Sequence, residues 1–581
     1  MLSKQRLLAV LCAAALAACS HQPIGPATAH TVDFAVTADQ IWQQAENITP
    51  YDPTALPDMS AATLAKAQQQ RLQLLSQLQK VDVAALSEQN QINHAVLSYR
   101  LQNDVDEYRF GAHYLPLNAE SGFHSDLTFM LAGAALRTET DVKNYLARLA
   151  SVPRYMAQQT DWMRQGQAKG YSQPKAVLQG YQDGIRSFIT ADVSQSVFYR
   201  PLLKPAPGID TKQWQQWQDQ AKTLIREQVN PAYQRYYDFF VQQYLPAARD
   251  DIAATALPDG AAFYQNRLEH YTTLKLTPAA VHQIGLNQVA RIRAEMEQVI
   301  RQTGFSGSFA DFVQFLRTDP RFYVKTPDQL LKEAAYLSKK IDAQLPKLFL
   351  TLPRTPYGVA PVPAEIAPKY TTGRYAGGRA AGEAGYYWVN TYALDRRPLY
   401  ELEALTLHEA VPGHHLQIAL ANEQSNLPSY RRSFYTSAFG EGWGLYAEYL
   451  GLEVGFYQDP YSNFGRLTYE MWRAARLVVD TGMHTMGWSR QQAIDFLASN
   501  TALSMHNVTT EIDRYISWPA QALSYKLGEI TIRQLRQEAE QALAAQFDVR
   551  EFHDVLLRNG SLPLPVLEQQ VRQYIRQKKT Q

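Results

Sequence analysis

Histidine and glutamate side chains are concentrated in one short segment of the chain, LTLHEAVPGHHLQ at residues 405–417. The whole chain contains 13 histidines, yet His408, His414 and His415 all fall in this segment, and Glu409 follows the first of them. Two imidazoles that approach from one side of a helix can bind Zn²⁺, and a glutamate after the first histidine can reach the metal-bound water as a general base. These residue types therefore predict a zinc-dependent hydrolytic site.

The spacing of the second histidine departs from the usual HExxH pattern, in which the two ligands lie one helical turn apart. His414 and His415 follow His408 by six and seven positions, which would place His415 roughly 10.5 Å further along an undistorted helix. Pro412 has no N–H to donate and Gly413 is conformationally permissive, so we predict a bulge or break in the helix before His414. Such a distortion favours His414 as the second ligand, and His415 remains the alternative.

A third protein ligand is expected downstream, because catalytic zinc sites use three protein ligands and leave the fourth position open. The segment FGEGWGLYAE at residues 439–448 offers Glu441, and a helical pattern follows it. Glu448 lies on the same helical face, where it could orient a metal ligand or be a solvated surface residue. We predict one Zn²⁺ ion held by Glu441, His408 and one of the two later histidines.

The elements that carry these residues are mostly helical. Strand signals are limited to GYYWVNTY at residues 385–392, which follows a Gly-rich turn. This strand precedes the histidine-bearing helix, where zincins keep an edge strand that pairs with a substrate. It is either such an edge strand or an ordinary buried strand, and we expect a small antiparallel β-sheet near residues 355–395. Apolar residues at helical spacing predict helices over residues 61–80, 211–249, 277–301, 326–345, 401–420 and 489–502.

Composition excludes several classes of protein. Hydrophobic residues make up 46% of the 581 residues and charged residues 19%, and the 30 Gly and 30 Pro are near the average for globular proteins. Collagen-like, disordered and low-complexity proteins are thereby excluded. With 56 basic and 55 acidic residues the formal net charge is +1, so no overall field attracts a polyanion, and nucleic acid is not an expected partner. No serine-hydrolase elbow, Walker motif or dinucleotide fingerprint occurs in its required context.

The only two cysteines lie in the first 19 residues, MLSKQRLLAVLCAAALAAC. A short basic region, an apolar stretch and small residues are the layout of a secretory signal peptide, and its end resembles a bacterial lipobox with Cys19 as the lipidated residue. We therefore expect residues 1–18 to be a signal peptide and residues 19–37 a lipidated flexible tether. The expected location is the outer membrane, facing the periplasm, with the lipid as the membrane anchor.

Three motifs together carry a resemblance to a known family: HEAVPGHHLQ, EGWGLYAE, and ISWPAQALSYKLG at residues 516–528. With Leu257–Gly260 and Tyr264 they resemble the bacterial domain of unknown function family 885, marked by HExxPGH, over nearly the whole mature chain. The resemblance implies a zincin-like metallopeptidase fold, mostly α and two-lobed, with a deep cleft. We expect residues 38–581 to form one such unit, with a helical lobe over 38–350 and the motif-bearing lobe over 351–581.

Peptide hydrolysis also needs a hydrogen-bond donor for the oxyanion. Tyr525, His484 and Tyr387 are the candidates. Related zincins use a tyrosine or histidine from a C-terminal helix, and Tyr525 matches that placement best.

Substrate contacts are expected from Tyr387 and Asn390 on the predicted strand and from Arg476. The Arg476 side chain could hold a substrate carboxylate, and an internal ion pair with Asp480 explains its spacing equally well.

The predicted function is zinc-dependent hydrolysis of peptide bonds, with Glu409 passing a proton from the water to the leaving amine. The expected partner is a peptide or a small amide. One alternative is a non-catalytic, peptidase-like binding or scaffold lipoprotein, and another is a zinc amidase that acts on a non-protein substrate. The sequence leaves the choice between endo- and exopeptidase cleavage, and the oligomeric state, open.

Overall fold

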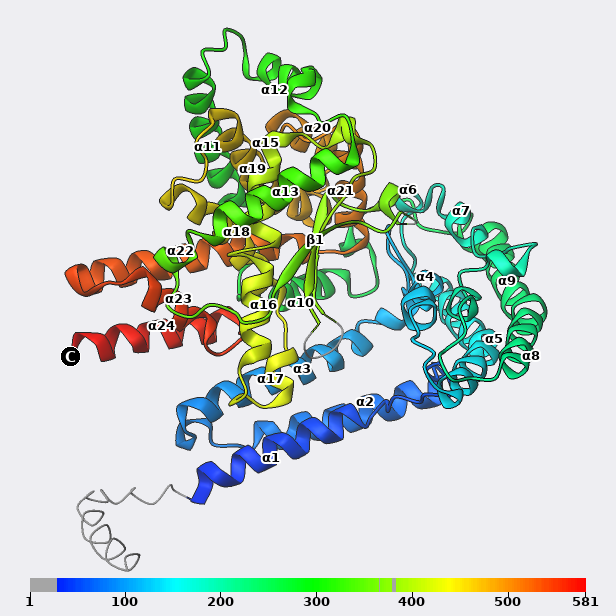
Figure 1. The fold of residues 1–581 in the computed structure, drawn as a ribbon. Helices are drawn as coiled ribbons and strands as arrows, with labels where there is room; N and C mark the ends of the chain where they lie inside the picture. The colour runs from blue at the N-terminus through cyan, green and yellow to red at the C-terminus, as the bar shows by residue number, and fades with distance from the viewer. Residues whose placement is uncertain (1–28, 365, 379–382, 581) are drawn as a thin grey trace, which may run out of the picture.

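The computed structural model describes residues 29–364, 366–378 and 383–580, and Figure 1 shows its fold. The predicted signal peptide and Cys19 lie outside the described residues. Helix α1 (Ala29–Glu46) already includes residues 29–37, so the predicted tether is wrong over that part. The reason is that Phe34, Ala38 and Ile41, spaced by four and three positions, are buried in the core.

Helices make up most of the described chain, and none of the described helices combines the length and apolar character needed to cross a bilayer. After α1 they are α2 (Ala61–Gln79), α3 (Glu88–Arg109), α4 (Phe123–Leu127), α5 (Glu139–Ala168), α6 (Lys175–Leu178), α7 (Tyr181–Arg186), α8 (Thr211–Leu224), α9 (Asn230–Phe239), α10 (Gly260–Thr272), α11 (Pro278–Gln302), α12 (Phe309–Thr318), α13 (Pro327–Asp342), α14 (Leu345–Leu348), α15 (Leu399–Glu409), α16 (His414–Glu423), α17 (Ser429–Ser433), α18 (Ser437–Glu453), α19 (Pro460–Thr485), α20 (Arg490–Asn500), α21 (Met505–Ser517), α22 (Ser524–Leu543), α23 (Val549–Leu557) and α24 (Leu564–Lys579).

The mostly helical class is confirmed. Four of the six predicted helices correspond to α2, α11, α13 and α20. The predicted helix over 211–249 is present as α8 and α9, joined by a π-helical segment at Ile225–Val229. The predicted helix over 401–420 is divided into α15 and α16, with the division at the predicted Pro-Gly break.

The sheet has three strands, β1 (Tyr357–Pro361), β2 (Gly373–Ala376) and β3 (Gly385–Val389), in the order β1-β3-β2. Strand β2 pairs antiparallel with β3, but β1 runs parallel to β3. The prediction of an antiparallel sheet is therefore wrong for β1. Because the chain forms β2 between β1 and β3, it reverses twice before β3 and arrives there in the direction of β1.

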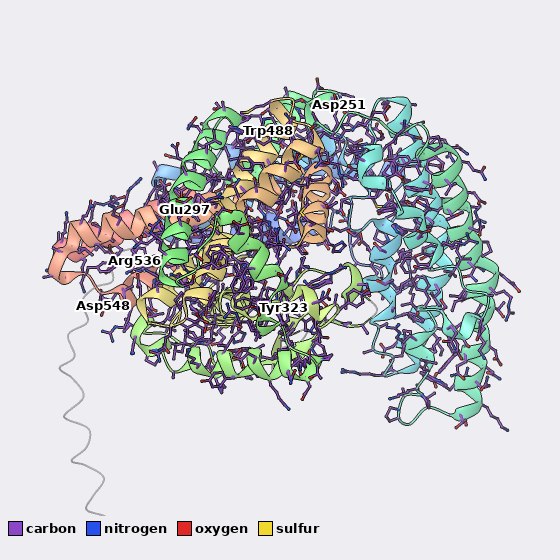
Figure 2. The ribbon with its side chains drawn as sticks, turned by 90° about the horizontal axis from the view of Figure 1, so that it is seen from above. Asp251, Glu297, Tyr323, Trp488, Arg536 and Asp548 are labelled. Atoms are coloured by element: carbon purple, nitrogen blue, oxygen red, sulfur yellow. The ribbon has the colours of Figure 1, made fainter. Side chains whose placement is uncertain are left out.

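The helices form two blocks. In Figure 1, α4 to α9 lie at the right, α1 to α3 run along the lower part, and the sheet lies with α10 to α24 at the centre and left. Figure 2, viewed from above, shows the cyan helices beside the block that carries Glu297, Tyr323 and Trp488. Helix α11 packs along α19, so the chain before residue 350 contributes to both blocks. The predicted division into lobes at residue 350 stays a prediction.

Helix α19 lies at the centre of the larger block and packs against α11, α15, α20 and α21. Its residues from Phe464 to His484 are all buried. Charged side chains in such a place must be paired, and Glu470 accordingly accepts from Arg466 at 3.0 Å and from Lys526 at 2.8 Å. The centre of the block is therefore apolar packing crossed by ion pairs.

Helices α18 and α22 cross at van der Waals distance because glycines face each other. A Cβ added to Gly528 would lie 2.0 Å from the carbonyl oxygen of Ala438, and one added to Gly442 would lie 2.6 Å from the backbone of Gly528. Backbone cannot yield at these distances, so the crossing requires glycine on both helices. This crossing of α18 and α22 sets the position of Glu441, because Glu441 lies on α18.

We expect Gly528→Ala to destabilise the protein by about 1–3 kcal/mol, because the added methyl group overpacks a backbone contact. The matched control is Gly184→Ala in α7, where an added Cβ meets nothing within 4 Å and a neutral or slightly stabilising change is expected. Thermal unfolding followed by circular dichroism compares the two variants with the parent protein. Equal melting temperatures for the two variants would contradict the proposed packing.

Candidate metal centre

The structure confirms the predicted helix break before His414 and shows what stabilises it. Helix α15 ends at Glu409 and α16 begins at His414. A Cβ at Gly413 would lie 1.9 Å from a backbone carbonyl oxygen of α15, so only glycine fits at this position. The carbonyl of Pro412 accepts a hydrogen bond from the indole N–H of Trp443 at 2.8 Å. The break is therefore held by α18 as well as by its own sequence.

Two histidines and one glutamate converge at this break. The Nε2 atoms of His408 and His414 each lie 3.4 Å from Oε2 of Glu441, and one ligand atom from each residue lies within 4.8 Å of the others. The three residues come from three different helices, α15, α16 and α18. Two imidazoles and one carboxylate are a donor set found in catalytic zinc sites, so His408, His414 and Glu441 could hold a metal ion. These three residues are called the metal group.

Glu448 fixes the orientation of the His408 ring. Its Oε1 accepts from Nδ1 of His408 at 2.8 Å, and its side chain is 1% exposed. With Nδ1 as the donor, Nε2 faces Glu441 and His414, so in the neutral ring its lone pair would be directed at a metal held between them. Arg473 Nη2 lies 3.7 Å from the same Glu448 oxygen and balances its charge.

Electrostatics in this group favour charged forms. Burial disfavours the imidazolium of His408, but hydrogen bonds to Glu441 and Glu448 outweigh it and raise its pKa to about 9. Burial likewise opposes ionisation of Glu441, but the charges and hydrogen bonds of His414 and His408 lower its pKa well below the usual value. Without a metal, the positive charge that balances the Glu441 carboxylate is therefore that of protonated His408.

Two glycines of α18 allow this helix to approach the rings of His408 and Tyr435 closely. A Cβ at Gly444 would lie 2.7 Å from Cε1 of His408, and one at Gly440 would lie 2.2 Å from the ring of Tyr435. The Tyr435 hydroxyl in turn donates to Oε1 of Glu441 at 3.4 Å. This stretch of α18 therefore carries Glu441 and leaves room for the rings of His408 and Tyr435.

Glu409 lies beside the metal group and contacts the sheet. Its Oε2 accepts from the backbone N–H of Tyr375 in β2 at 2.7 Å, and the side chain is 8% exposed. Strand β2 is therefore the edge strand next to the site. The expectation that the strand at 385–392 forms this edge is wrong, because β3 is paired on both sides.

His415 points away from the metal group. Its Nδ1 lies 3.0 Å from the Tyr375 hydroxyl, and its ring centroid lies 4.5 Å from that of Tyr357. Burial lowers its pKa to about 4. The group of three thus contains His414 and leaves His415 as a neutral packing residue behind the strand.

Tyr525 lies in the first turn of α22, half-buried, with the Arg476 guanidinium 4.2 Å from its ring centroid. Arg476 itself is 2% exposed and pairs with Glu511 at 3.0 Å rather than with Asp480. It also donates from Nε to the Tyr515 hydroxyl at 2.7 Å. The predicted direct contact of Arg476 with substrate is therefore withdrawn, since its side chain is held inside the protein.

Three other predicted site residues are engaged in holding the fold. The ring of His484 is fully buried and bonds the N–H of Ala254 at 2.9 Å and the carbonyl of Tyr515 at 3.0 Å, so neither nitrogen is available to an oxyanion. Asn390 is buried and donates to three backbone carbonyls of residues 367–371. Tyr387 is 0% exposed on the inner face of β3. We correct all three assignments, since buried polar groups need internal partners.

Three residues beside the metal group were missed by sequence reasoning: Arg374, Tyr375 and Tyr435. The first two lie in the Gly-rich stretch that reads as a turn, GRYAGG at residues 373–378. Tyr375 is the donor to Glu409, and Arg374 is exposed on the opposite face of the strand. Alternation of an aromatic residue with glycines before the predicted strand is the signal that could have indicated a second strand.

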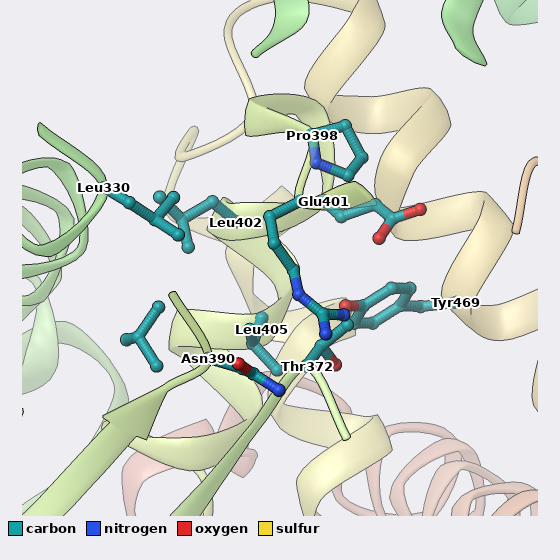
Figure 3. A pocket seen from close by; sticks show the side chains of 10 residues that line it. Leu330, Thr372, Asn390, Pro398, Glu401, Leu402, Leu405 and Tyr469 are labelled. Atoms are coloured by element: carbon teal, nitrogen blue, oxygen red, sulfur yellow. The ribbon is translucent and has the colours of Figure 1, made fainter. Parts of the chain in front are cut away.

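A small cavity near the start of α15 is separate from this site (Figure 3). Its volume is about 20 Å³, enough for about one water molecule. Glu401, Asn390, Arg397 and Tyr469 contribute polar groups to its lining. It is too small for a peptide and does not include the metal group.

Two solved structures share this fold. A protein from Colwellia psychrerythraea, described as a "putative lipoprotein", matches with a TM-score of 0.86 and 28% sequence identity, over 94% of this chain and 99% of that one. A "putative lipoprotein of unknown function" from Shewanella oneidensis matches with a TM-score of 0.71 and 17% identity, over 92% of this chain and 99% of that one. A comparison with curated proteins found no match.

The family resemblance drawn from the motifs is confirmed by a match over most of the chain. The model of the family described as "Bacterial protein of unknown function (DUF885)" matches residues 44–571. The chain therefore belongs to this family of bacterial proteins.

Proposed function

We propose that this protein is a zinc-dependent peptidase. The observation that carries the proposal is the convergence of His408, His414 and Glu441, whose ligand atoms lie within 4.8 Å of one another, next to the carboxylate of Glu409. A zincin-like two-lobed peptidase fold, implied by the family resemblance, belongs to the same proposal.

The residues present fit a zinc ion. Nε2 of His408 is directed by the hydrogen bond to Glu448, and Glu441 supplies one negative charge. Three protein donors leave a position for water, and zinc bound there would acidify that water and polarise the scissile carbonyl.

Glu409 is the general base of the proposed reaction. Its Oε2 is held by the N–H of Tyr375, which leaves the other oxygen to accept a proton from the attacking water. The hydroxyl adds to the carbonyl carbon, the C–N bond breaks, and Glu409 delivers the proton to the leaving amine. Water is thus consumed and a carboxyl and an amine are formed.

The edge of β2 and Tyr525 support this assignment. An extended peptide that adds to the free edge of β2 would pass Glu409, since that edge already faces its carboxylate. We assign oxyanion stabilisation to the half-buried Tyr525, whose ring is positioned by Arg476.

The proposed location is the cell envelope. The lipobox-like segment ending in Cys19 and the lipoprotein description of the Colwellia psychrerythraea relative support a lipid anchor. The outer membrane, with the catalytic unit facing the periplasm, is the location we propose.

Zinc content distinguishes the two histidines after the break. We expect His414→Gln to lose stoichiometric zinc, because it removes one of three protein ligands, whereas His415→Gln retains it. Elemental analysis of the purified proteins after dialysis measures the difference. Zinc loss in His415→Gln with retention in His414→Gln would reverse the ligand assignment.

The proposed base is tested by Glu409→Gln. We expect peptide hydrolysis to fall by about 10²- to 10⁴-fold, the usual contribution of general base catalysis, with zinc content unchanged. Release of amines from a mixture of short peptides measures the rate, and elemental analysis controls for the metal. A variant as active as the parent would refute the mechanism.

Glu448→Gln tests the orientation of His408. We expect zinc affinity to fall about 10- to 100-fold, because the charged acceptor on Nδ1 is lost. Competition with a zinc-binding dye measures the affinity. The matched control is Glu453→Gln on the same helix, whose carboxylate pairs with Arg536 at 2.7 Å and should leave zinc affinity unchanged. Equal affinities in the two variants would exclude a role for Glu448 in holding the metal.

A further inference from the structure

Arg374 lies close enough to Glu441 and Glu409 for their charges to act on it, and it has no ion-pair partner among the described residues. Arg374 is exposed on β2, one residue before the Tyr375 N–H that binds Glu409. None of the ion pairs between described residues includes Arg374, and its guanidinium instead lies 5.5 Å from the ring centroid of Tyr370. A side-chain hydrogen bond also joins Arg374 to Tyr370. Because a guanidinium has five N–H donors, donors remain for an anion.

The register of the sheet shows which way this side chain projects. Arg374 pairs with Trp388 across the β2–β3 ladder, so the two side chains share one face. Tyr375 projects from the other face, where its hydroxyl contacts His415. Arg374 therefore belongs to the outer face of the sheet, at the edge that faces Glu409.

A second group of charges contacts Tyr525, the proposed oxyanion donor. Arg476 stacks on its ring and pairs with Glu511 at 3.0 Å. Arg514 pairs with the same Glu511 at 3.3 Å and lies 3.9 Å from Glu120. These two arginines are thus matched by two carboxylates.

Arg374 adds a third guanidinium group to this region. Burial raises the pKa of Glu120, and the positive charges of Arg514, Arg374 and Arg476 oppose that rise, so all three guanidinium groups are close enough to act on one carboxylate. Glu409, Tyr525 and Glu441 also act on Arg374. A divalent zinc ion would offset Glu409 and Glu441. Three guanidinium groups then share Glu511 and Glu120, which leaves one positive charge for a bound anion.

We propose that Arg374 binds the C-terminal carboxylate of the peptide substrate, so that the enzyme acts as an exopeptidase at the carboxyl end. The proposal rests on the proposed peptidase function and adds the substrate class. The terminal carboxylate is the one anion that every unblocked peptide carries, and a planar guanidinium binds it through two parallel hydrogen bonds. An edge strand that aligns the substrate backbone beside Glu409 would place that terminus near the neighbouring residue of the same strand.

The test compares two forms of the same substrates. Full-length protein in detergent, loaded with zinc, is given a mixture of N-acetylated hexapeptides with either free-acid or amidated C-termini. We expect kcat/KM for the acid forms to exceed that for the amides by about 10- to 100-fold, the range of a hydrogen bond to a charged group. Mass spectrometry should show short products released from the carboxyl end. Equal cleavage of acids and amides would overturn the proposal.

Two variants distinguish loss of C-terminal carboxylate binding from a general loss of activity. Arg374→Gln should lower cleavage of the acids to the level of the amides without changing cleavage of the amides or the zinc content. Arg572→Gln, at an exposed arginine of α24 paired with Glu538 and Glu568, should change neither. An equal loss for acids and amides in Arg374→Gln would show that Arg374 acts through Glu409 and would refute binding of the terminus.

A binding measurement distinguishes failure of this proposal from failure of the peptidase function. Calorimetry with zinc-loaded Glu409→Gln should show tighter binding of the acid peptides than of the amides, and the preference should disappear when Arg374→Gln is added. If that preference is found but the parent protein cleaves nothing, the peptidase function fails and the carboxylate site stands. If neither form binds, or both bind equally, the carboxylate site is refuted.

Discussion

The imidazole of His408 is held between two glutamates of one helix, and the rest of the site depends on this contact. Glu448 accepts a hydrogen bond from Nδ1 at 2.8 Å, and Glu441 lies 3.4 Å from Nε2. The two glutamates are about two helical turns apart on α18. The ring fits between them because Gly444, which lies between the two, has no side chain: a Cβ there would lie 2.7 Å from the ring. One close approach thus sets which ring nitrogen faces Glu441 and how far apart α15 and α18 lie.

The same stretch of α18 also stabilises the break that brings the second histidine into place. Trp443 is fully buried and donates to the carbonyl of Pro412, inside the break. Adjacent residues of α18 therefore have complementary roles, since Trp443 holds the break and Gly444 makes room for His408. Behind them, the Gly442–Gly528 crossing brings α22 and Tyr525 close to the same helix. The order of glycine and large residues in EGWG reads as a packing requirement set by three neighbouring segments.

Residue types and spacing predicted the three residues that converge, His408, His414 and Glu441, better than the residues that surround them. His408 and Glu441 stand out because the chain has few histidines, and Pro-Gly before His414 indicates a break by a local backbone rule. The roles of Arg476 and His484 could not be assigned in this way. The sequence gives the residue type at each helix position, but whether the side chain is buried depends on the tertiary structure. Helix α19 is surrounded on all sides, so polar residues that look available for substrate are internal partners. The direction of β1 depends on the path of the chain between strands, which no local pattern encodes.

The charges of His408 and Glu441 stabilise the arrangement of the site without a metal. A His408 pKa of about 9, above its ordinary value of 6.5, means that the imidazolium persists at neutral pH, while Glu441 remains a carboxylate. Attraction between them, together with the hydrogen bond from His408 to Glu448, outweighs the desolvation that burial imposes on both groups. Because the pKa is raised on folding, this contribution to stability is complete below about pH 6.5 and is lost as the pH rises through about 9. A divalent ion that displaces the proton satisfies the same carboxylate and removes that loss. The arrangement that binds a proton in the metal-free chain is therefore the one that a metal site of this composition requires.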